Sequence, residues 1–313
     1  MSGTKSLLTV VTAVYNGGDY IEETIVSVLK FASSVDFEYI VMNDGSTDGT
    51  LEILERYSDR ITIFSHANCG ESESVTRAFE AARGEYLLVV SADDPLLTSK
   101  LFQDVFEWFK NDPNLVAVYP DWQMIDADGN ILQTVYVPDY SDELMIGKCR
   151  TLPGPGVIFR KDAALKIGGR HSRWVYVGDY DFWLRLGRLG EIRHRPGVLA
   201  QWRHHPSSTS VSKRGPAMAL ERIQVVEEFL SNNSIEKTLV KKALGHAYYT
   251  AARLAFFSRE VPGKKYLYKA FKNRRGWVES AELPVIAFIV LDPLSRLIVW
   301  PLKSLRIFRV RNL

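Results

Sequence analysis

The amino-acid sequence predicts an α/β fold, with a mostly parallel β-sheet flanked by helices and a helical extension at the C-terminus. Strand-like and helix-like segments alternate through the first third of the chain, which is the pattern of successive β–α–β units. The strand-like segments are continuous apolar runs instead of alternating ones. Such runs are typical of parallel strands that helices cover on both faces.

The first β–α unit lies at the N-terminus. Residues 7–14 are rich in Val and Thr, and this apolar run predicts a buried strand. The turn Asn-Gly-Gly-Asp follows at 16–19, and Asp19 is a suitable N-cap for the next helix, which continues to about residue 30. The apolar run enters this turn without a small-residue cleavage site, so we expect no signal peptide.

The later units follow the same logic. The predicted strands are at 37–43, 61–65, 86–91 and 115–119, and the predicted helices are at 50–57, 72–83 and 99–110. Gly84 ends the helix that precedes it, because glycine readily adopts the left-handed conformation of a helix C-terminus. Pro, Gly and aromatic residues become frequent over 138–206, which predicts mixed strands and long loops.

Charge divides the chain into two parts. Residues from 213 onward carry 19 Lys and Arg against 8 Asp and Glu, whereas the preceding residues carry 20 against 29. We therefore expect a larger domain at 1–212, a helical basic region at 213–282 and an amphipathic tail at 283–313. The excess of positive charge favours an anionic partner, either a membrane surface or a nucleic acid.

Composition and motifs exclude several classes of protein. Hydrophobic residues make up 46% and charged residues 24% of the chain, which is typical of a globular protein and excludes a disordered one. The two cysteines, Cys69 and Cys149, cannot form a disulfide framework or a zinc site of the usual spacing. Neither G-x-G-x-x-G nor G-x-x-x-x-G-K-[ST] follows a predicted strand, which argues against a dinucleotide fold and a P-loop.

Polar residues follow three of the predicted strands, at the sheet edge where open α/β sheets bind their ligands. Tyr15 follows the first strand, Asp44 the second, and Asp93 and Asp94 the strand at 86–91. Adjacent carboxylates at a strand end suit Mg²⁺ or Mn²⁺. Both aspartates also have a purely structural explanation. Asp94 suits a turn before a proline, and Asp44 suits an Asx-turn.

Two further clusters lie later in the chain. Asp179 and Asp181 precede a helix-like segment, where they either stabilise the helix dipole or supply a general base. Adjacent histidines, His204 and His205, follow Trp202-Arg203. Neighbouring side chains on a strand point to opposite faces, so at most one of the two histidines can enter a site.

Together, these segments resemble the inverting nucleotide-sugar glycosyltransferases of family two, which have the GT-A fold and include enzymes of bacterial cell-surface polysaccharide synthesis. The resemblance covers about residues 6–212 and makes this region a GT-A catalytic domain. It rests on five segments in the expected order, namely 11–16 (VTAVYN), 43–50 (NDGSTDGT), 84–94 (GEYLLVVSADD), 178–185 (GDYDFWLR) and 203–210 (RHHPSSTS).

The resemblance implies roles for individual residues. Tyr15, with the backbone of Ala13 close by, matches the position against the nucleotide base, and Asp44 matches a hydrogen-bond acceptor for that base, typically uracil. Asp93 matches a contact to the ribose or to the surroundings of the metal.

The resemblance also implies a metal and a base. Asp94 matches the ligand of Mn²⁺ or Mg²⁺ on the donor diphosphate, His205 a further metal ligand, and Asp179 the catalytic base. Two positions depart from the family pattern. Asn43 and Gly178 stand where many members have Asp and Glu, which leaves Asp44 and Asp179 as the matching acids.

We therefore expect a hexosyltransferase that moves a sugar from a nucleotide diphosphate sugar, UDP-linked in the typical case, to a glycan or lipid-linked acceptor by single displacement. A sugar nucleotidyltransferase is the alternative enzyme, but its Gly-rich basic first loop is absent here. An inactive nucleotide-sugar-binding scaffold of the same fold is the other alternative, against which the joint presence of Asp44, Asp94 and Asp179 argues.

The tail suggests where the protein acts. Apolar residues recur at helical spacing after Pro293, with Trp300 and basic residues among them, which predicts an amphipathic helix on an anionic membrane surface. We therefore expect a cytoplasmic protein at the inner face of the cell membrane. The alternative is a helix packed on the protein or on a second subunit. No nucleic-acid motif accompanies the basic residues, so we expect no nucleic-acid partner.

Overall fold

The structure is a computed structural model of the 313-residue chain. It describes residues 8–30, 36–97, 102–206, 208, 215–258 and 263–273. The amphipathic tail expected at 283–313 therefore lies outside the described residues. The chain divides into two compact units, one within Met1–Tyr140 and Thr151–Ser212 and the other within Ser141–Arg150 and Lys213–Leu313.

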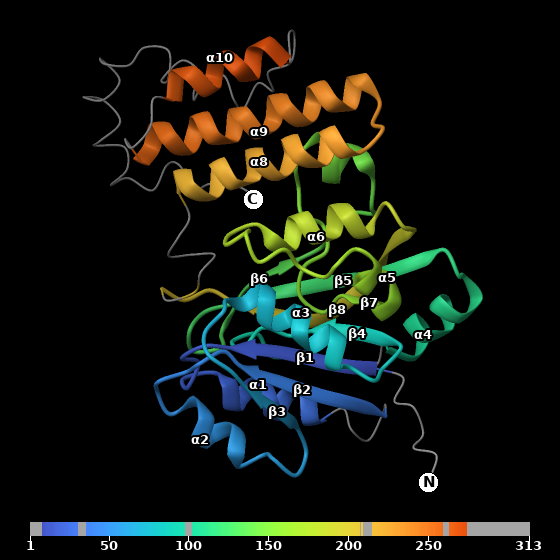
Figure 1. Cartoon of the computed structure of the whole chain (residues 1–313), viewed down its shortest axis with the longest axis vertical. Coiled ribbons are helices and arrows are strands. Elements are labelled where there is room, and N and C mark those ends of the chain that lie inside the picture. The colour runs from blue at the N-terminus through green and yellow to red at the C-terminus, as the bar shows by residue number, and fades with distance from the viewer. Residues whose placement is uncertain are drawn as a thin grey trace. The chain divides into compact units, whose positions relative to one another are not determined.

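The first unit is built on an eight-stranded sheet in the order β3-β2-β1-β4-β7-β5-β6, with β8 paired to β5 (Figure 1). The strands are β1 (Leu8–Val14), β2 (Phe37–Asn43), β3 (Thr62–Ser65), β4 (Tyr86–Val89), β5 (Leu115–Ile125), β6 (Ile131–Val135), β7 (Ile158–Arg160) and β8 (Glu191–Arg203). Strands β1 to β4 pair in parallel, as do β5 and β8, whereas β7 is antiparallel to β4 and β5, and β6 to β5. The predicted α/β fold with a mostly parallel sheet is confirmed.

Helices follow most of the strands of this unit. They are α1 (Ile21–Leu29), α2 (Thr50–Glu55), α3 (Glu71–Ala81), α4 (Phe102–Asn111), α5 (Lys161–Lys166) and α6 (Gly178–Leu186). In α1, Ile21, Ile25 and Val28 recur at helical spacing and are all buried. This spacing gives the helix one apolar face, which its burial against the sheet stabilises.

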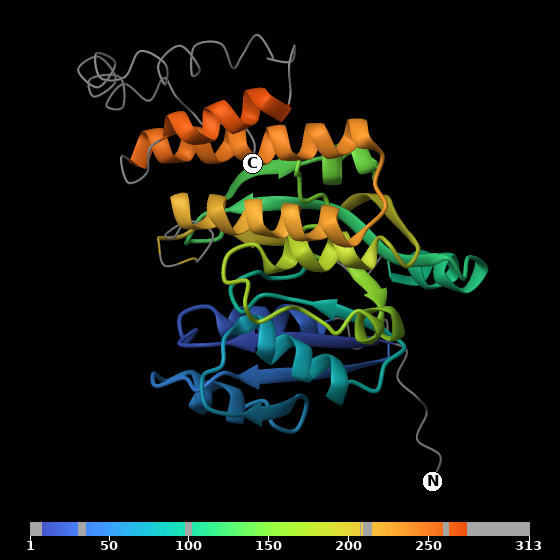
Figure 2. The ribbon, with the colours of Figure 1, turned by 45° about the horizontal axis from the view of Figure 1, so that its top comes forward.

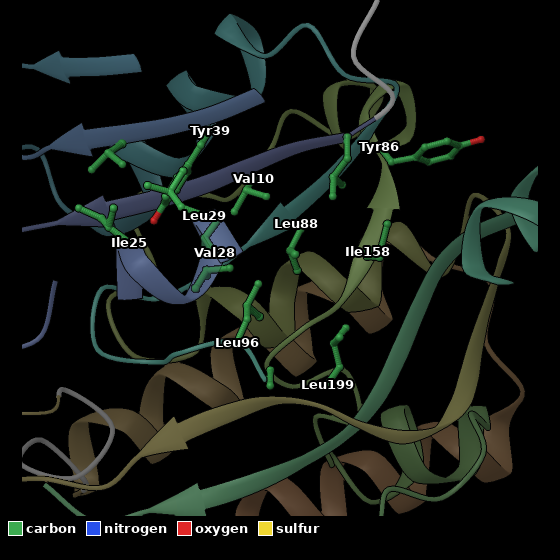
Figure 3. Packing of buried hydrophobic residues seen from close by; sticks show 14 of the residues in the cluster. Val10, Ile25, Val28, Leu29, Tyr39, Tyr86, Leu88, Leu96, Ile158 and Leu199 are labelled. Carbon is green, nitrogen blue, oxygen red and sulfur yellow. The ribbon is translucent and has the colours of Figure 1, made fainter. Parts of the chain in front are cut away.

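The first unit has apolar packing on both faces of its sheet. On one face, Val10 and Leu88 of the strands pack in a single cluster with Ile25 of α1 (Figure 3). On the other face, Phe159 of β7 makes edge-to-face contacts with Phe79 of α3 and Phe182 of α6. Burial on both faces explains why the strands read as continuous apolar runs.

The second unit is helical. It contains α8 (Pro216–Asn232), α9 (Lys237–Ser258), α10 (Gly263–Asn273) and a short helical turn at Glu143–Gly147. Helix α9 packs beside both α8 and α10 (Figure 2), and Lys242 Nζ lies 2.8 Å from Glu143 Oε2 of the short turn. Within the described part of the chain, no helix combines the length and apolar character that crossing a membrane requires.

Gly84, between α3 and β4, lies against the backbone of the neighbouring strand. A Cβ at this position would lie 2.5 Å from the amide nitrogen of Thr9 and 2.7 Å from the carbonyl carbon of Leu8. We expect Gly84→Ala to lower the free energy of unfolding by about 1–3 kcal/mol, because the buried strand must shift to admit the methyl group. Chemical denaturation measures this loss.

Gly49→Ala is the matched control for this substitution. Gly49 has a φ of −72°, and the nearest atom to its added Cβ is a side-chain oxygen of Glu52 at 3.9 Å. We expect little change in stability from it. Equal stability of the Gly84→Ala and Gly49→Ala chains would contradict the proposed role of the close backbone approach.

Candidate active site

The loops that follow β1 and β2 are locked together at the carboxyl edge of the sheet. The backbone N–H of Asp44 donates to the carbonyl oxygen of Val14 at 2.9 Å. The Asn16 side chain accepts from the N–H of Thr47 at 2.8 Å, and the N–H of Asn16 donates to Ser46 Oγ at 3.0 Å. Because these bonds join two loops that a helix separates in the chain, they bring Tyr15 and Asp44 to one edge.

Asp48 strengthens this junction. Its carboxylate accepts hydrogen bonds from the N–H groups of Gly18 and Thr50 and from the Thr50 hydroxyl. Burial acts to raise the pKa of Asp48, but these hydrogen bonds outweigh it and lower the pKa below its usual value. Sequence reasoning did not single out Asp48. The signal for it is the sequence Asp-Gly-Thr at the end of the loop, because an Asp side chain readily bonds the backbone N–H two residues further on.

The expected donor-binding residues lie around this junction. Tyr15 exposes 54% of its surface just beyond β1, and Ala13, near the end of β1, is partly buried. Asp44 is buried, and its two carboxylate oxygens accept hydrogen bonds from the N–H groups of Cys69 and Gly70 at 2.7 and 3.0 Å. Asp44 therefore also holds the loop that leads into α3.

Asp93 and Asp94 have different surroundings although they are adjacent in the chain. Asp94 is buried, and its Oδ1 accepts the backbone N–H of Arg203 at 2.8 Å. Burial, followed by the charge of Asp93, raises the pKa of Asp94 well above its usual value. Asp93 remains 27% exposed, and its Oδ2 lies 2.8 Å from His205 Nε2. The sequence led us to expect His205 with Asp94; the structure places it against Asp93.

Arg203, at the end of β8, organises this part of the site. Its guanidinium is fully buried and donates to the carbonyl oxygen of Asp93 at 3.0 Å and to Glu23 of α1 at 2.6 Å. It also stacks over the ring of Tyr20, which in turn contacts the His205 ring. These contacts join the end of β8 to the Asp93–Asp94 loop and to α1. Arg203 lies in the segment 203–210 that carries the family resemblance, but the resemblance implied no role for it.

The two histidines after β8 face different surroundings. His205 is buried against Tyr20 and Asp93, whereas His204 is exposed. The two side chains therefore differ in burial, and that at most one of them enters the site stays a prediction.

Asp179 and Asp181 occupy the first turn of α6 but differ in exposure. Asp181 is buried and paired with Arg185 at 2.7 Å and with His171 at 3.1 Å. Asp179 is exposed and makes no ion pair with any described residue, while its Oδ1 accepts the N–H of Tyr180 at 2.7 Å. Of the two, Asp179 has the carboxylate that an incoming substrate can reach.

The start of α6 also lies beside the start of α3. A Cβ on Gly178 would lie 3.0 Å from Ser72 Oγ and 3.6 Å from the Cβ of Trp174. A larger residue at this position would crowd Ser72. Because Ser72 follows Gly70 closely in the chain, this packing brings the first turn of α6 towards the loop that Asp44 holds.

The sequence is similar to those of known glycosyltransferases. The sequence model of "Glycosyl transferase family 2" matches residues 9–147. An uncharacterised glycosyltransferase of Rickettsia typhi is 31% identical over 217 residues, which cover 65% of this chain and 66% of that protein. The chain belongs to glycosyl transferase family 2. The hyaluronan synthase of Pasteurella multocida is 27% identical over 213 residues, 67% of this chain but 22% of that protein. The chain thus spans only part of the length of these relatives.

Solved structures show the same fold. Staphylococcus aureus TarS 1–349 in complex with UDP superposes with a TM-score of 0.65 at 17% identity, covering 96% of this chain and 93% of that one. The mannosyltransferase PcManGT from Pyrobaculum calidifontis, in complex with GDP-Man and Mn²⁺, gives a TM-score of 0.53 at 16% identity, covering 94% and 83%. The catalytic fold of this family 2 chain is therefore GT-A.

The residues at the β4 and β8 ends fit a divalent metal ion. Asp93 offers a partly exposed carboxylate and His205 an imidazole, with their nearest atoms 2.8 Å apart. Carboxylate oxygen suits Mg²⁺ and Mn²⁺, and imidazole suits the softer transition metals. Mn²⁺ accepts both, so this donor set favours Mn²⁺ over Mg²⁺. Asp94 contributes differently, since its buried carboxylate is already bonded to the backbone of Arg203.

Proposed function

We propose that this family 2 chain is an inverting glycosyltransferase that moves a hexosyl group from a nucleotide diphosphate sugar, UDP-linked, to a glycan or lipid-linked acceptor. The observation that carries the proposal is that the candidate base and the candidate metal ligands come from different elements. Asp93 lies with His205 at a strand end, whereas Asp179 is exposed on a separate helix. Inverting transfer needs a base and a phosphate-binding group that are separate, because the base and the diphosphate lie on opposite sides of the reacting carbon.

The donor is proposed to lie across the junction of the β1 and β2 loops. Exposed Tyr15 offers a ring for the base, with the backbone of Ala13 beside it. The Asp44 carboxylate already accepts two backbone N–H bonds, and each of its oxygens keeps a second lone pair for a base N–H. The UDP in TarS supports a uridine donor.

Asp93 and His205 are proposed to hold Mn²⁺ or Mg²⁺, with the donor phosphates and water completing its coordination. The metal supplies positive charge that stabilises the departing diphosphate. Asp94 is proposed to act indirectly, without binding the metal. Its bond to the N–H of Arg203 sets the position of the loop that carries Asp93. The Mn²⁺ in PcManGT supports this assignment of a metal.

Asp179 is proposed to be the base. It takes the proton from the acceptor hydroxyl as that oxygen forms a bond to the anomeric carbon. The bond from this carbon to the diphosphate breaks in the same step, so the configuration inverts and the nucleoside diphosphate leaves. The first-turn position on α6 also suits a carboxylate, because the helix dipole stabilises negative charge there.

We also propose that the acceptor of the sugar is bound to the membrane. It rests on the sequence of residues 283–313, where apolar residues at helical spacing are interleaved with basic ones. Attraction of such residues to anionic lipid would place the protein at the cytoplasmic face of the membrane, beside lipid-linked or growing glycans. The similarity to hyaluronan synthase supports a glycan acceptor.

A screen of nucleotide sugars by thermal unfolding tests the proposed function. We expect a UDP-sugar to raise the unfolding temperature only when Mn²⁺ or Mg²⁺ is present, because a ligand at 100 times its Kd stabilises the folded state by about 2.7 kcal/mol. The stabilising sugar is then assayed for transfer with glycan acceptors. Stabilisation by no nucleotide sugar, with or without metal, would refute the proposal.

A further inference from the structure

Three residues that commonly bind transition metals meet beside the β2 and β3 ends. Asp44 follows β2, His66 follows β3, and Cys69 lies just before α3. One potential ligand atom from each residue lies within 4.8 Å of the other two. This Asp44–His66–Cys69 cluster shares no residue with the Asp93–His205 pair proposed above.

The two distances from His66 to its partners in the cluster match those of a tetrahedral zinc site. His66 Nδ1 lies 3.4 Å from Asp44 Oδ1 and 3.6 Å from Cys69 Sγ. A zinc ion with ordinary tetrahedral bond lengths holds a nitrogen and an oxygen ligand about 3.4 Å apart, and a nitrogen and a sulfur ligand about 3.5–3.6 Å apart. His66 is therefore already spaced from Asp44 and from Cys69 as a shared zinc ion would hold them, and the Asp44 oxygen and the Cys69 sulfur lie within 4.8 Å of each other.

The surroundings of the cluster hold its ligands in place. The Asp44 carboxylate is fixed by the N–H groups of Cys69 and Gly70. Ser74 Oγ, buried on α3, lies 3.5 Å from His66 Nε2. A metal-bound histidine nearly always donates its other ring N–H to a hydrogen-bond acceptor, and the Ser74 hydroxyl can accept one. His66 Nδ1 also lies 3.0 Å from the carbonyl oxygen of Ala67, so binding an ion at Nδ1 moves the ring proton to the side facing Ser74.

The chemistry of the ligands selects the metal. Burial, together with the Asp44 carboxylate, raises the pKa of the Cys69 thiol, so an ion must displace the thiol proton to bind. Zn²⁺ forms strong bonds to thiolate and imidazole, whereas Mg²⁺ prefers oxygen ligands alone. His66 is 16% exposed, which leaves a path for the ion and for a water in the fourth position.

We propose that Asp44, His66 and Cys69 form a zinc-binding site. Its consequence for donor binding rests on the proposed function: an ion held by Asp44 competes with the nucleotide base for the same carboxylate. Zinc then opposes donor binding at this site, whereas the metal at Asp93 and His205 assists it.

Cobalt absorbance of the full-length chain tests the site directly. Co²⁺ substitutes for Zn²⁺, and a thiolate bound to it gives a charge-transfer band in the near ultraviolet. We expect one such site per chain, loss of the band in Cys69→Ser, and retention in the matched control Cys149→Ser. His66→Gln should weaken Zn²⁺ binding, measured by competition with Co²⁺, at least tenfold. Absence of the band in the wild-type chain, or its persistence in Cys69→Ser, would overturn the proposal.

Two controls separate this site from the rest of the proposal. Circular dichroism without metal should be the same for all variants, so that loss of the band reports lost ligands and not lost structure. Uridine, which has no phosphate to chelate the ion, should bind more weakly when Zn²⁺ is present. Cobalt binding through Cys69 in a chain that ignores uridine would support the zinc site and refute the proposed base contact of Asp44.

Discussion

Asp179→Asn lowers the rate of sugar transfer by about 10²–10⁴-fold, the usual contribution of a positioned general base. The substitution keeps the size of the side chain and its hydrogen bond to the N–H of Tyr180, but it removes the basic oxygen. Because Asp179 is exposed and makes no ion pair with a described residue, we expect the fold and the affinity for the donor to be unchanged. Transfer assays and donor titrations measure the two quantities separately.

Asp181→Asn is the control for this substitution because it lies on the same turn of α6. It weakens the buried pairing with Arg185 and His171, so we expect it to lower the free energy of unfolding by about 1–3 kcal/mol. Transfer by the molecules that remain folded should continue. If Asp181→Asn is folded but inactive while Asp179→Asn transfers normally, Asp181 is the base and Asp179 is not.

Asp93→Asn abolishes the metal dependence of donor binding, whereas Asp94→Asn preserves it. Asparagine at 93 removes the charged oxygen beside His205, so we expect a loss of at least 100-fold in turnover from the missing metal ligand. Asparagine at 94 still accepts the N–H of Arg203 through its own carbonyl oxygen. It also replaces a carboxylate whose burial is unfavourable when charged.

Titration of Mn²⁺ in the presence of the donor measures this difference. The wild-type chain and the Asp94→Asn chain should give similar metal affinities, and both should lose donor binding when excess chelator is added. The opposite order, with metal dependence lost in Asp94→Asn and kept in Asp93→Asn, would restore the assignment that the sequence suggested. Donor binding by all three chains in chelator would exclude a metal at either carboxylate.

The α/β architecture could be predicted from the sequence because it depends on local patterns. The segments that form β1, β2 and β4 are buried on both faces. Each of them is therefore a continuous apolar run in the sequence. The polar residues after these strands could also be predicted to meet at one edge, since parallel strands carry their carboxyl ends to the same side.

The sequence by itself thus determined the fold class, the order of the first strands and helices, and the segments that form the candidate site. Only the tertiary structure decided which neighbouring carboxylate meets His205, because the contacts of Asp93 and Asp94 depend on β8, which is distant in the chain. It likewise placed Glu143–Gly147 with the C-terminal helices and brought Asp44 to His66 and Cys69. Spacing along the chain cannot reveal such groups, because strand pairing and loop closure between distant segments create them.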